Sequence, residues 1–193
     1  SGCGAVAETL IVYLSHSGVL ERLRQREECV VFEVGLGTAT SFLLTAALAQ
    51  FHRTPLVYHA VEWMLLPVEL FGQLQLPSAI ERCLSSGLGQ AAHGTDPHLG
   101  EPAFQAAEFQ FLPQLVETWC DWVSQTMFSS DCLSYRCQLS AWVRLELYLG
   151  DARAGDAAWR KHLPRGGCDA IYFDPFSPET NPELWSRPIF TEL

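Results

Sequence analysis

Four apolar stretches of the chain have the pattern of strands in the interior of a sheet. Residues 29–34, 56–62 and 168–174 are mostly apolar and rich in β-branched or aromatic side chains, which is typical of strands buried on both faces. Residues 142–149 instead alternate apolar and polar side chains, so we expect a strand with one exposed face. The sequence therefore predicts four core strands.

Helical patterns fill the intervals between these strands. We expect helices over 38–51, from Pro67 towards Leu74, over 109–127 and over 154–162. Because helices alternate with strands, the chain is expected to form an α/β fold, with a doubly wound, mostly parallel sheet and helices on both faces.

The ends of this pattern are less regular. Residues 8–26 show no clear period, and we expect a short strand over Thr9–Leu14 and a short helix over Gly18–Glu27. Residues 85–104 are rich in Gly, His, Pro and Asp and are typical of a loop. At 193 residues, the chain is expected to be a single domain, and we expect an insertion at about 80–105.

The charge of the chain limits the classes of partner that we expect. With 12 basic residues and a formal net charge of −10, the composition is not that of an ordinary nucleic-acid-binding protein, which needs clustered Lys and Arg. Arg22, Arg24 and Arg26 lie close together, and a solvated helix face is the simplest interpretation of them.

Cysteine, histidine and hydropathy patterns exclude several other classes. The seven cysteines form no CxxC pair and are interpreted as reduced thiols of a cytoplasmic protein. The six histidines show no metal-binding spacing, so we expect no metal. There is no apolar run long enough to span a membrane and no signal-peptide pattern, so we expect no membrane association.

A glycine-rich turn follows the first core strand. Gly35-Leu36-Gly37 allows a tight turn and a close approach of a ligand to the backbone. In an open parallel sheet, ligands bind at the carboxyl ends of the strands. The GxGxxG spacing of dinucleotide-binding proteins fails, because Thr40 stands at its third position. Alone, the turn indicates only a nucleotide ligand.

Acidic residues end the next two core strands. Glu62 follows Gly35 by 27 residues, at a place where a carboxylate can accept hydrogen bonds from both hydroxyls of a ribose. An exposed Glu that caps the next helix is the alternative. Asp151 could accept a hydrogen bond from the exocyclic amine of an adenine. An Asp that caps the N-terminus of a helix is an equally good interpretation.

The segment after the fourth core strand, 174–185, is the most unusual of the chain. Asp174 precedes three prolines, which make a loop stiff, and aromatic and amide side chains in it are suited to wall a pocket for a flat polar substrate. The alternative is a structural turn in which Asn181 begins a helix.

These motifs together resemble the MnmC-type methyltransferases, which methylate 5-aminomethyl-2-thiouridine at the tRNA wobble position. The family pattern E-x-G-x-G-T-G matches residues 33–38, an acidic strand end matches Glu62, and G-D matches residues 150–151. Its pattern D-x-F-[AS]-P-x-x-N-P-[DE]-[LM]-W matches 174–185 at nine positions of twelve. The resemblance covers roughly 29–75 and 142–193.

The resemblance implies a Rossmann-like class I fold, S-adenosylmethionine as cofactor, and a wobble uridine of tRNA as substrate. It assigns catalysis to Asp174, which would contact the aminomethyl group. It implies that the cofactor is bound by Glu33, Gly35, Leu36, Gly37, Thr38, Glu62, Trp63, Asp151 and Ala152. It implies that the substrate is bound by Phe176, Ser177, Pro178, Asn181 and Trp185.

The chain departs from the family pattern at several positions. Ala39 replaces the third glycine, which is a mild change if the backbone there is helical. Ser41 replaces an Asn, and Trp63 replaces a Lys, where it could stack on the adenine or simply pack. The class has seven strands, so we expect the C-terminal strands to be missing after the fourth core strand and its helix. Nothing in the chain resembles the flavin-dependent oxidase half of the fused enzymes, so we expect the stand-alone methyltransferase form.

Three other functions stay open at this point. The acidic charge suits a class I methyltransferase for a small molecule or a protein. A nicotinamide oxidoreductase is disfavoured by the failed glycine spacing. A non-catalytic remnant of the fold would not bind S-adenosylmethionine. The sequence leaves the oligomeric state undetermined.

Overall fold

The sheet contains five strands. A computed structural model describes residues 4–86, 104–126, 128, 133–153, 163, 166–175 and 178–192. Within these residues the strand order is β3-β4-β2-β1-β5, and all neighbours are parallel except the pair β3 and β4. The strands are β1 (Cys29–Val34), β2 (Leu56–Glu62), β3 (Ser134–Gln138), β4 (Val143–Leu149) and β5 (Ala170–Phe173). The expected Rossmann-like, mostly parallel α/β sheet is confirmed.

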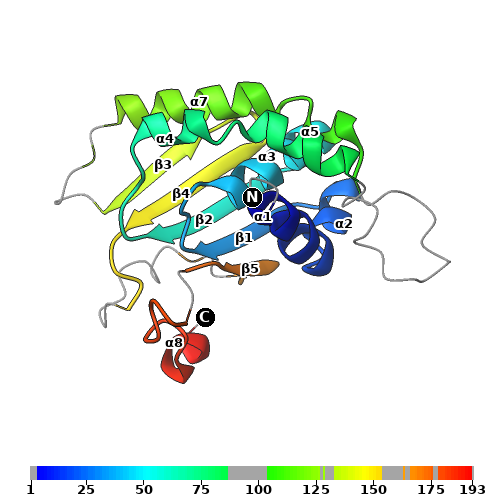
Figure 1. The fold of residues 1–193 in the computed structure, drawn as a ribbon. Helices are drawn as coiled ribbons and strands as arrows, with labels where there is room; N and C mark the ends of the chain where they lie inside the picture. The colour runs from blue at the N-terminus through cyan, green and yellow to red at the C-terminus, as the bar shows by residue number, and fades with distance from the viewer. Residues whose placement is uncertain are drawn as a thin grey trace.

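The helical elements before β3 cover one face of this sheet (Figure 1). Their side chains share one core with alternate residues of the strands, such as Val31, Tyr58 and Leu145. These elements are α1 (Gly4–Glu8), η1 (Thr9–His16), α2 (Val19–Arg24), α3 (Thr40–His52), α4 (Val68–Gln73), α5 (Leu76–Ser85), η2 (Ala106–Phe109) and α7 (Leu112–Gln125).

Helix α3 lies at the centre of this core. Residues 40–49 are all buried, because α3 packs against the sheet on one side and against η1, η2 and α7 on the others. A helix that is apolar on most sides is stable only in such a position. The helix therefore fixes the glycine-rich turn that precedes it against the sheet.

The opposite face of the sheet carries a smaller apolar cluster. Phe32, Val34, Val61 and Tyr148 form it, with Phe173 packed alongside. Among the described helices, α8 (Arg187–Glu192) lies apart from the others near β5, and its Phe190 ring contacts Phe173 (Figure 1). The helix expected over 154–162 lies outside the described residues.

The structure corrects one sequence prediction and adds a helix and a strand. Residues 9–14 are not a strand: Thr9–His16 form a π-helix, because their apolar side chains pack against α2 and α3 rather than join a sheet edge. Helix α5 and strand β3 were not expected. Helix α5 continues to Ser85 and residues 87–103 lie outside the described residues, so the insertion expected at about 80–105 stays a prediction.

The carboxyl ends of the parallel strands meet at one edge. Val34 is paired with Val61 and with Phe173, and Glu62 is paired with Leu149. This register brings the residues that follow β1, β2, β4 and β5 to the same side of the molecule, where ligands bind in open parallel sheets.

Candidate functional site

Gly35 brings the glycine-rich turn against the loop that follows β5. Its φ is +89°, and a Cβ there would lie 2.6 Å from the carbonyl oxygen of Asp174 and 3.1 Å from Cα of Pro175. Its N–H donates a hydrogen bond of 2.9 Å to the carbonyl oxygen of Val61. No side chain fits in this space, so only glycine allows the two loops to approach so closely.

Gly37 faces open space at the other end of the turn. Its φ is +49°, and no atom lies within 4 Å of an added Cβ. The neighbouring Leu36 is only 3% exposed and belongs to the core, whereas the Thr38 hydroxyl forms a hydrogen bond of 2.8 Å with the hydroxyl of Thr40. The turn therefore presents backbone and small polar groups to a ligand.

Ala39 has a left-handed backbone, with φ 57° and ψ 19°. The expectation that it is a mild replacement for glycine required a helical backbone there, and this condition is not met. A left-handed conformation costs a residue with a Cβ about 1–2 kcal/mol. The buried methyl group of Ala39, which packs in the main core, offsets part of that cost.

The Glu62 carboxylate closes the turn from the side of β2. One oxygen accepts the N–H of Gly37 at 2.8 Å, and the other accepts the N–H of Met64 at 3.1 Å. Each carboxylate oxygen has a second lone pair, so both can also accept ligand hydroxyls. Trp63 is 67% exposed beside Glu62, so its ring does not pack into the core.

Asp151 is held by Arg153. The guanidinium Nε and Nη2 donate to both Asp151 oxygens at 2.7–3.0 Å, the Arg153 N–H adds a bond of 2.8 Å, and these interactions lower the pKa of Asp151. The same guanidinium donates from Nη1 to Glu183 at 2.6 Å. Ala152 packs beside the small apolar cluster. Only the remaining lone pairs of Asp151 are available to an adenine amine.

A hollow of about 360 Å³ opens between the glycine-rich turn and the N-terminal helical segment. The wall formed by α1 and η1 could not be predicted from the sequence, because residues 8–26 show no period that identifies a packed face. The lining residues are Ala5, Glu8, Thr9, Tyr13, Gly35, Leu36, Gly37, Thr38, Thr40, Ser41 and Asp174.

Carboxylates dominate the electrostatics of this hollow. Glu33 lies just behind it, 1% exposed, and accepts a hydrogen bond of 2.9 Å from the Tyr58 hydroxyl. Burial raises the pKa of Glu33 well above its usual range, and the Asp174 and Glu62 carboxylates raise it further. Partial burial and the Glu8 carboxylate also raise the pKa of Asp174.

None of the described residues that line the hollow is Lys or Arg. Because Glu8 and Asp174 line it, the hollow has a negative potential. It is suited to a ligand that carries positive charge.

The loop after Asp174 separates the expected substrate residues. Pro178 is exposed and Asn181 is half-buried, and the Asn181 carbonyl oxygen accepts the Leu184 N–H at 3.1 Å, so Asn181 begins a turn rather than a helix. Trp185 packs edge-on against Phe173, with ring centroids 4.9 Å apart, on the small-cluster side of the sheet. Phe176 and Ser177 lie outside the described residues.

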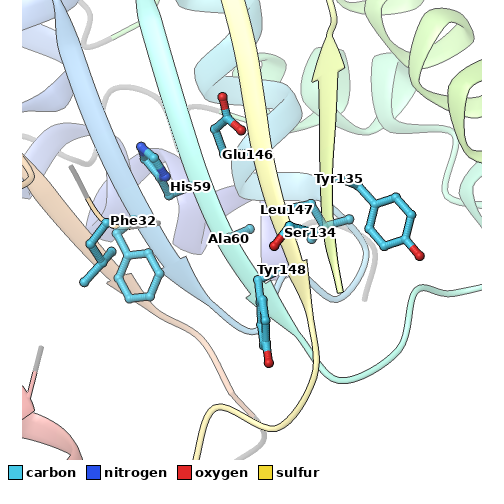
Figure 2. A pocket seen from close by; sticks show the side chains of 9 residues that line it. Phe32, His59, Ala60, Ser134, Tyr135, Glu146, Leu147 and Tyr148 are labelled. Carbon is cyan, nitrogen blue, oxygen red and sulfur yellow. The ribbon is translucent and has the colours of Figure 1, made fainter. Parts of the chain in front are cut away.

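A second hollow of about 300 Å³ lies elsewhere on the sheet. Figure 2 shows His59 and Glu146 there on neighbouring strands, and the two residues are paired in register. The Glu146 carboxylate accepts from Arg136 at 2.8 Å and forms an ion pair with Arg144. This hollow shares no lining residue with the first one, so it is separate from the acidic hollow.

Comparisons with known proteins show what this chain is similar to. Residues 114–193 match a family described as S-adenosyl-L-methionine-dependent methyltransferase. The chain is 28% identical over 194 residues to a tRNA 5-methylaminomethyl-2-thiouridine biosynthesis bifunctional protein MnmC of Azoarcus sp. (strain BH72). The resemblance to the MnmC-type methyltransferase domain is confirmed. S-adenosylmethionine is the cofactor of the matched family.

A solved structure shares the fold of this chain. The crystal structure of MNMC2 from Aquifex aeolicus superposes with a TM-score of 0.55 at 21% identity. The match covers 98% of this chain but 46% of the Aquifex chain, and the Azoarcus match covers 24% of that protein. The chain thus spans less than half of each of these MnmC relatives.

No described helix is both long and apolar enough to cross a membrane. No group of three or more His, Cys, Asp or Glu in the described ranges is arranged to hold a metal ion.

Proposed function

We propose that this MnmC-type domain transfers a methyl group from S-adenosylmethionine to the amine of 5-aminomethyl-2-thiouridine at the wobble position of a tRNA. The observation that carries the proposal is the contact between Gly35 and the backbone of Asp174, which joins the glycine-rich turn and the substrate loop at one acidic hollow. The name of the Azoarcus relative supports the substrate.

The residues of the hollow fit this cofactor. S-adenosylmethionine supplies a methyl group on a positively charged sulfur, and a wall that contains Glu8 and Asp174 favours a cation. Glu62 would accept hydrogen bonds from the ribose hydroxyls through its remaining lone pairs. Asp151 would accept a hydrogen bond from the adenine amine. Trp63, exposed next to Glu62, would cover the adenine ring.

The transfer breaks the bond between the methyl carbon and sulfur and forms a bond between that carbon and the substrate nitrogen. Sulfur keeps the electron pair as a neutral thioether, and the nitrogen releases a proton. Asp174 would attract the protonated amine, orient its neutral form and accept the proton, which its raised pKa favours. In this proposal Phe176, Ser177, Pro178, Asn181 and Trp185 bind the base.

Methyl transfer to a defined tRNA tests the proposal. Full-length protein is incubated with radiolabelled S-adenosylmethionine and tRNA that contains 5-aminomethyl-2-thiouridine. We expect label in the modified nucleoside with wild type, and in Asp174→Ala a strong loss of transfer with a much smaller loss of cofactor binding. Asp121→Ala, an exposed position of α7, is the matched control. Equal transfer by Asp174→Ala would exclude the role of Asp174.

A methyltransferase for a small molecule or a protein is the second candidate. It is favoured by the net charge of −10 and by the arginines of α2, since Arg22 pairs with Glu27 and Asp169, and Arg24 with Glu108. These pairs leave little positive charge for phosphates. Absence of tRNA binding even at low salt would favour this candidate over the tRNA enzyme.

A non-catalytic remnant is separated by a different measurement. Titration calorimetry with S-adenosylmethionine should show binding for either methyltransferase and no heat of binding for a remnant of the fold.

A further inference from the structure

Tyr13 reaches the end of β5 from the N-terminal helical segment. Its hydroxyl donates a hydrogen bond of 3.3 Å to the carbonyl oxygen of Phe173, the residue before Asp174. Its ring packs against Tyr172 with centroids 4.9 Å apart. Tyr13 also lines the acidic hollow, so its hydroxyl is placed between the core of η1 and the candidate catalytic carboxylate.

The side chain of Asp174 lies beside the same hydroxyl, whose single proton can be donated to the Asp174 carboxylate instead of the Phe173 carbonyl oxygen. The backbone of Asp174 is fixed independently, because its N–H donates a bond of 3.0 Å to the carbonyl oxygen of Val34. The strand therefore fixes the position of the Asp174 backbone. Among the described residues, Tyr13 is the side chain whose hydroxyl can hold the Asp174 carboxylate.

The other groups that face Asp174 are acids. The Glu8 carboxylate on α1 raises the pKa of Asp174. On β1, the pKa of Glu33 is raised by the charges of Asp174 and of Glu62 on β2. The hydrogen bond from Tyr13 acts in the opposite direction and lowers the pKa of Asp174. Loss of that bond would leave a carboxylate among like charges without a described side-chain donor.

We propose that Tyr13 is a positioning residue that holds the Asp174 carboxylate towards the reacting amine. For its effect on methyl transfer this inference rests on the proposed function, whereas the link between Tyr13 and Asp174 does not. The N-terminal segment then contributes a side chain to the site, and packing of the Tyr13 ring against Tyr172 holds that side chain in place.

Tyr13→Phe tests the link without removing the ring that packs on Tyr172. In full-length protein labelled with ¹³C at the Asp carboxyls, the Asp174 resonance is assigned by its loss in Asp174→Asn. We expect the pKa of Asp174 to rise in Tyr13→Phe and to stay unchanged in Tyr135→Phe, which lies on β3 at the far edge of the sheet. An unchanged Asp174 pKa in folded Tyr13→Phe would overturn the inference.

Kinetics then separate positioning from a structural effect. We expect kcat to fall roughly tenfold to hundredfold in Tyr13→Phe, the KM for S-adenosylmethionine to stay within about twofold, and the acid limb of the pH profile to move to higher pH. The double variant Tyr13→Phe/Asp174→Asn should be no slower than Asp174→Asn, and independent, multiplying losses would overturn the inference. If no variant, including wild type, transfers methyl groups, the proposed function fails, while the carboxyl titration still decides the link.

Discussion

Gly35 and Asp174 lie so close that a Cβ on Gly35 would stand 2.6 Å from the Asp174 carbonyl oxygen. The contact joins two motifs that are separated by most of the chain. It makes the glycine a requirement of the tertiary structure, beyond the needs of a turn.

Gly35→Ala should therefore destabilise the domain strongly. The positive φ and the clash with backbone atoms together predict a loss of about 3 kcal/mol or more in the free energy of unfolding. Gly37→Ala is the matched control, because open space surrounds that position and only backbone strain of about 1 kcal/mol is expected. Urea unfolding followed by tryptophan fluorescence measures both, and equal losses would contradict the role of the contact.

Glu62→Gln should weaken cofactor binding. The amide has one acceptor oxygen and no charge, so we expect the affinity for S-adenosylmethionine in calorimetry to fall about tenfold to hundredfold. Glu69→Gln, an exposed residue of α4, should bind like wild type. If Glu62→Gln binds as tightly as the control, the ribose role of Glu62 is wrong.

Glu33→Gln should raise stability above neutral pH. The pKa of Glu33 is raised from its ordinary 4.5 by burial, so its contribution to stability is complete below pH 4.5 and is lost as the pH rises towards its folded pKa. An uncharged amide removes this loss. The variant should be more stable than wild type at pH 8, with a difference that shrinks towards pH 4.

Glu81→Gln, an exposed residue of α5, should leave the pH dependence of stability unchanged. A constant difference between Glu33→Gln and wild type across this pH range would contradict the shifted pKa.

Glu108→Gln should destabilise the protein by disrupting the contacts of η2 with α2 and α3. This residue is 3% exposed and accepts two hydrogen bonds of 3.0 Å from Arg24, one of 2.9 Å from the Gln105 N–H and another of 2.9 Å with His52. Burial raises the pKa of Glu108, but these partners outweigh it and hold the pKa below its ordinary value. We expect a loss of about 2 kcal/mol at pH 7.

The pH dependence of that loss gives the check. A lowered folded pKa means that the stabilisation is present above pH 4.5 and is lost as the pH falls through the folded pKa. Unfolding of Glu108→Gln and wild type should therefore converge in acid. Glu117→Gln, exposed on α7, should match wild type throughout, and a similar loss in that control would exclude a specific role of the buried pair.

The sequence determined the strands and the residues at their ends. The apolar runs predicted β1 and β2 to the residue, because a strand buried on both faces needs an uninterrupted local pattern. Once those strands are parallel and in register, Gly35, Glu62 and Asp174 must meet at one edge.

Only the tertiary structure decided what completes the site. The apolar run at 9–14 fits a strand or a helix, and packing of η1 against α2 and α3 selected the helix that brings Glu8 and Tyr13 to the hollow. The left-handed backbone of Ala39 and the pairing of Arg153 with Glu183 could not be predicted either, since neither follows from local pattern. Periodicity reports which residues are buried, while contacts between distant segments fix backbone strain and ion-pair partners.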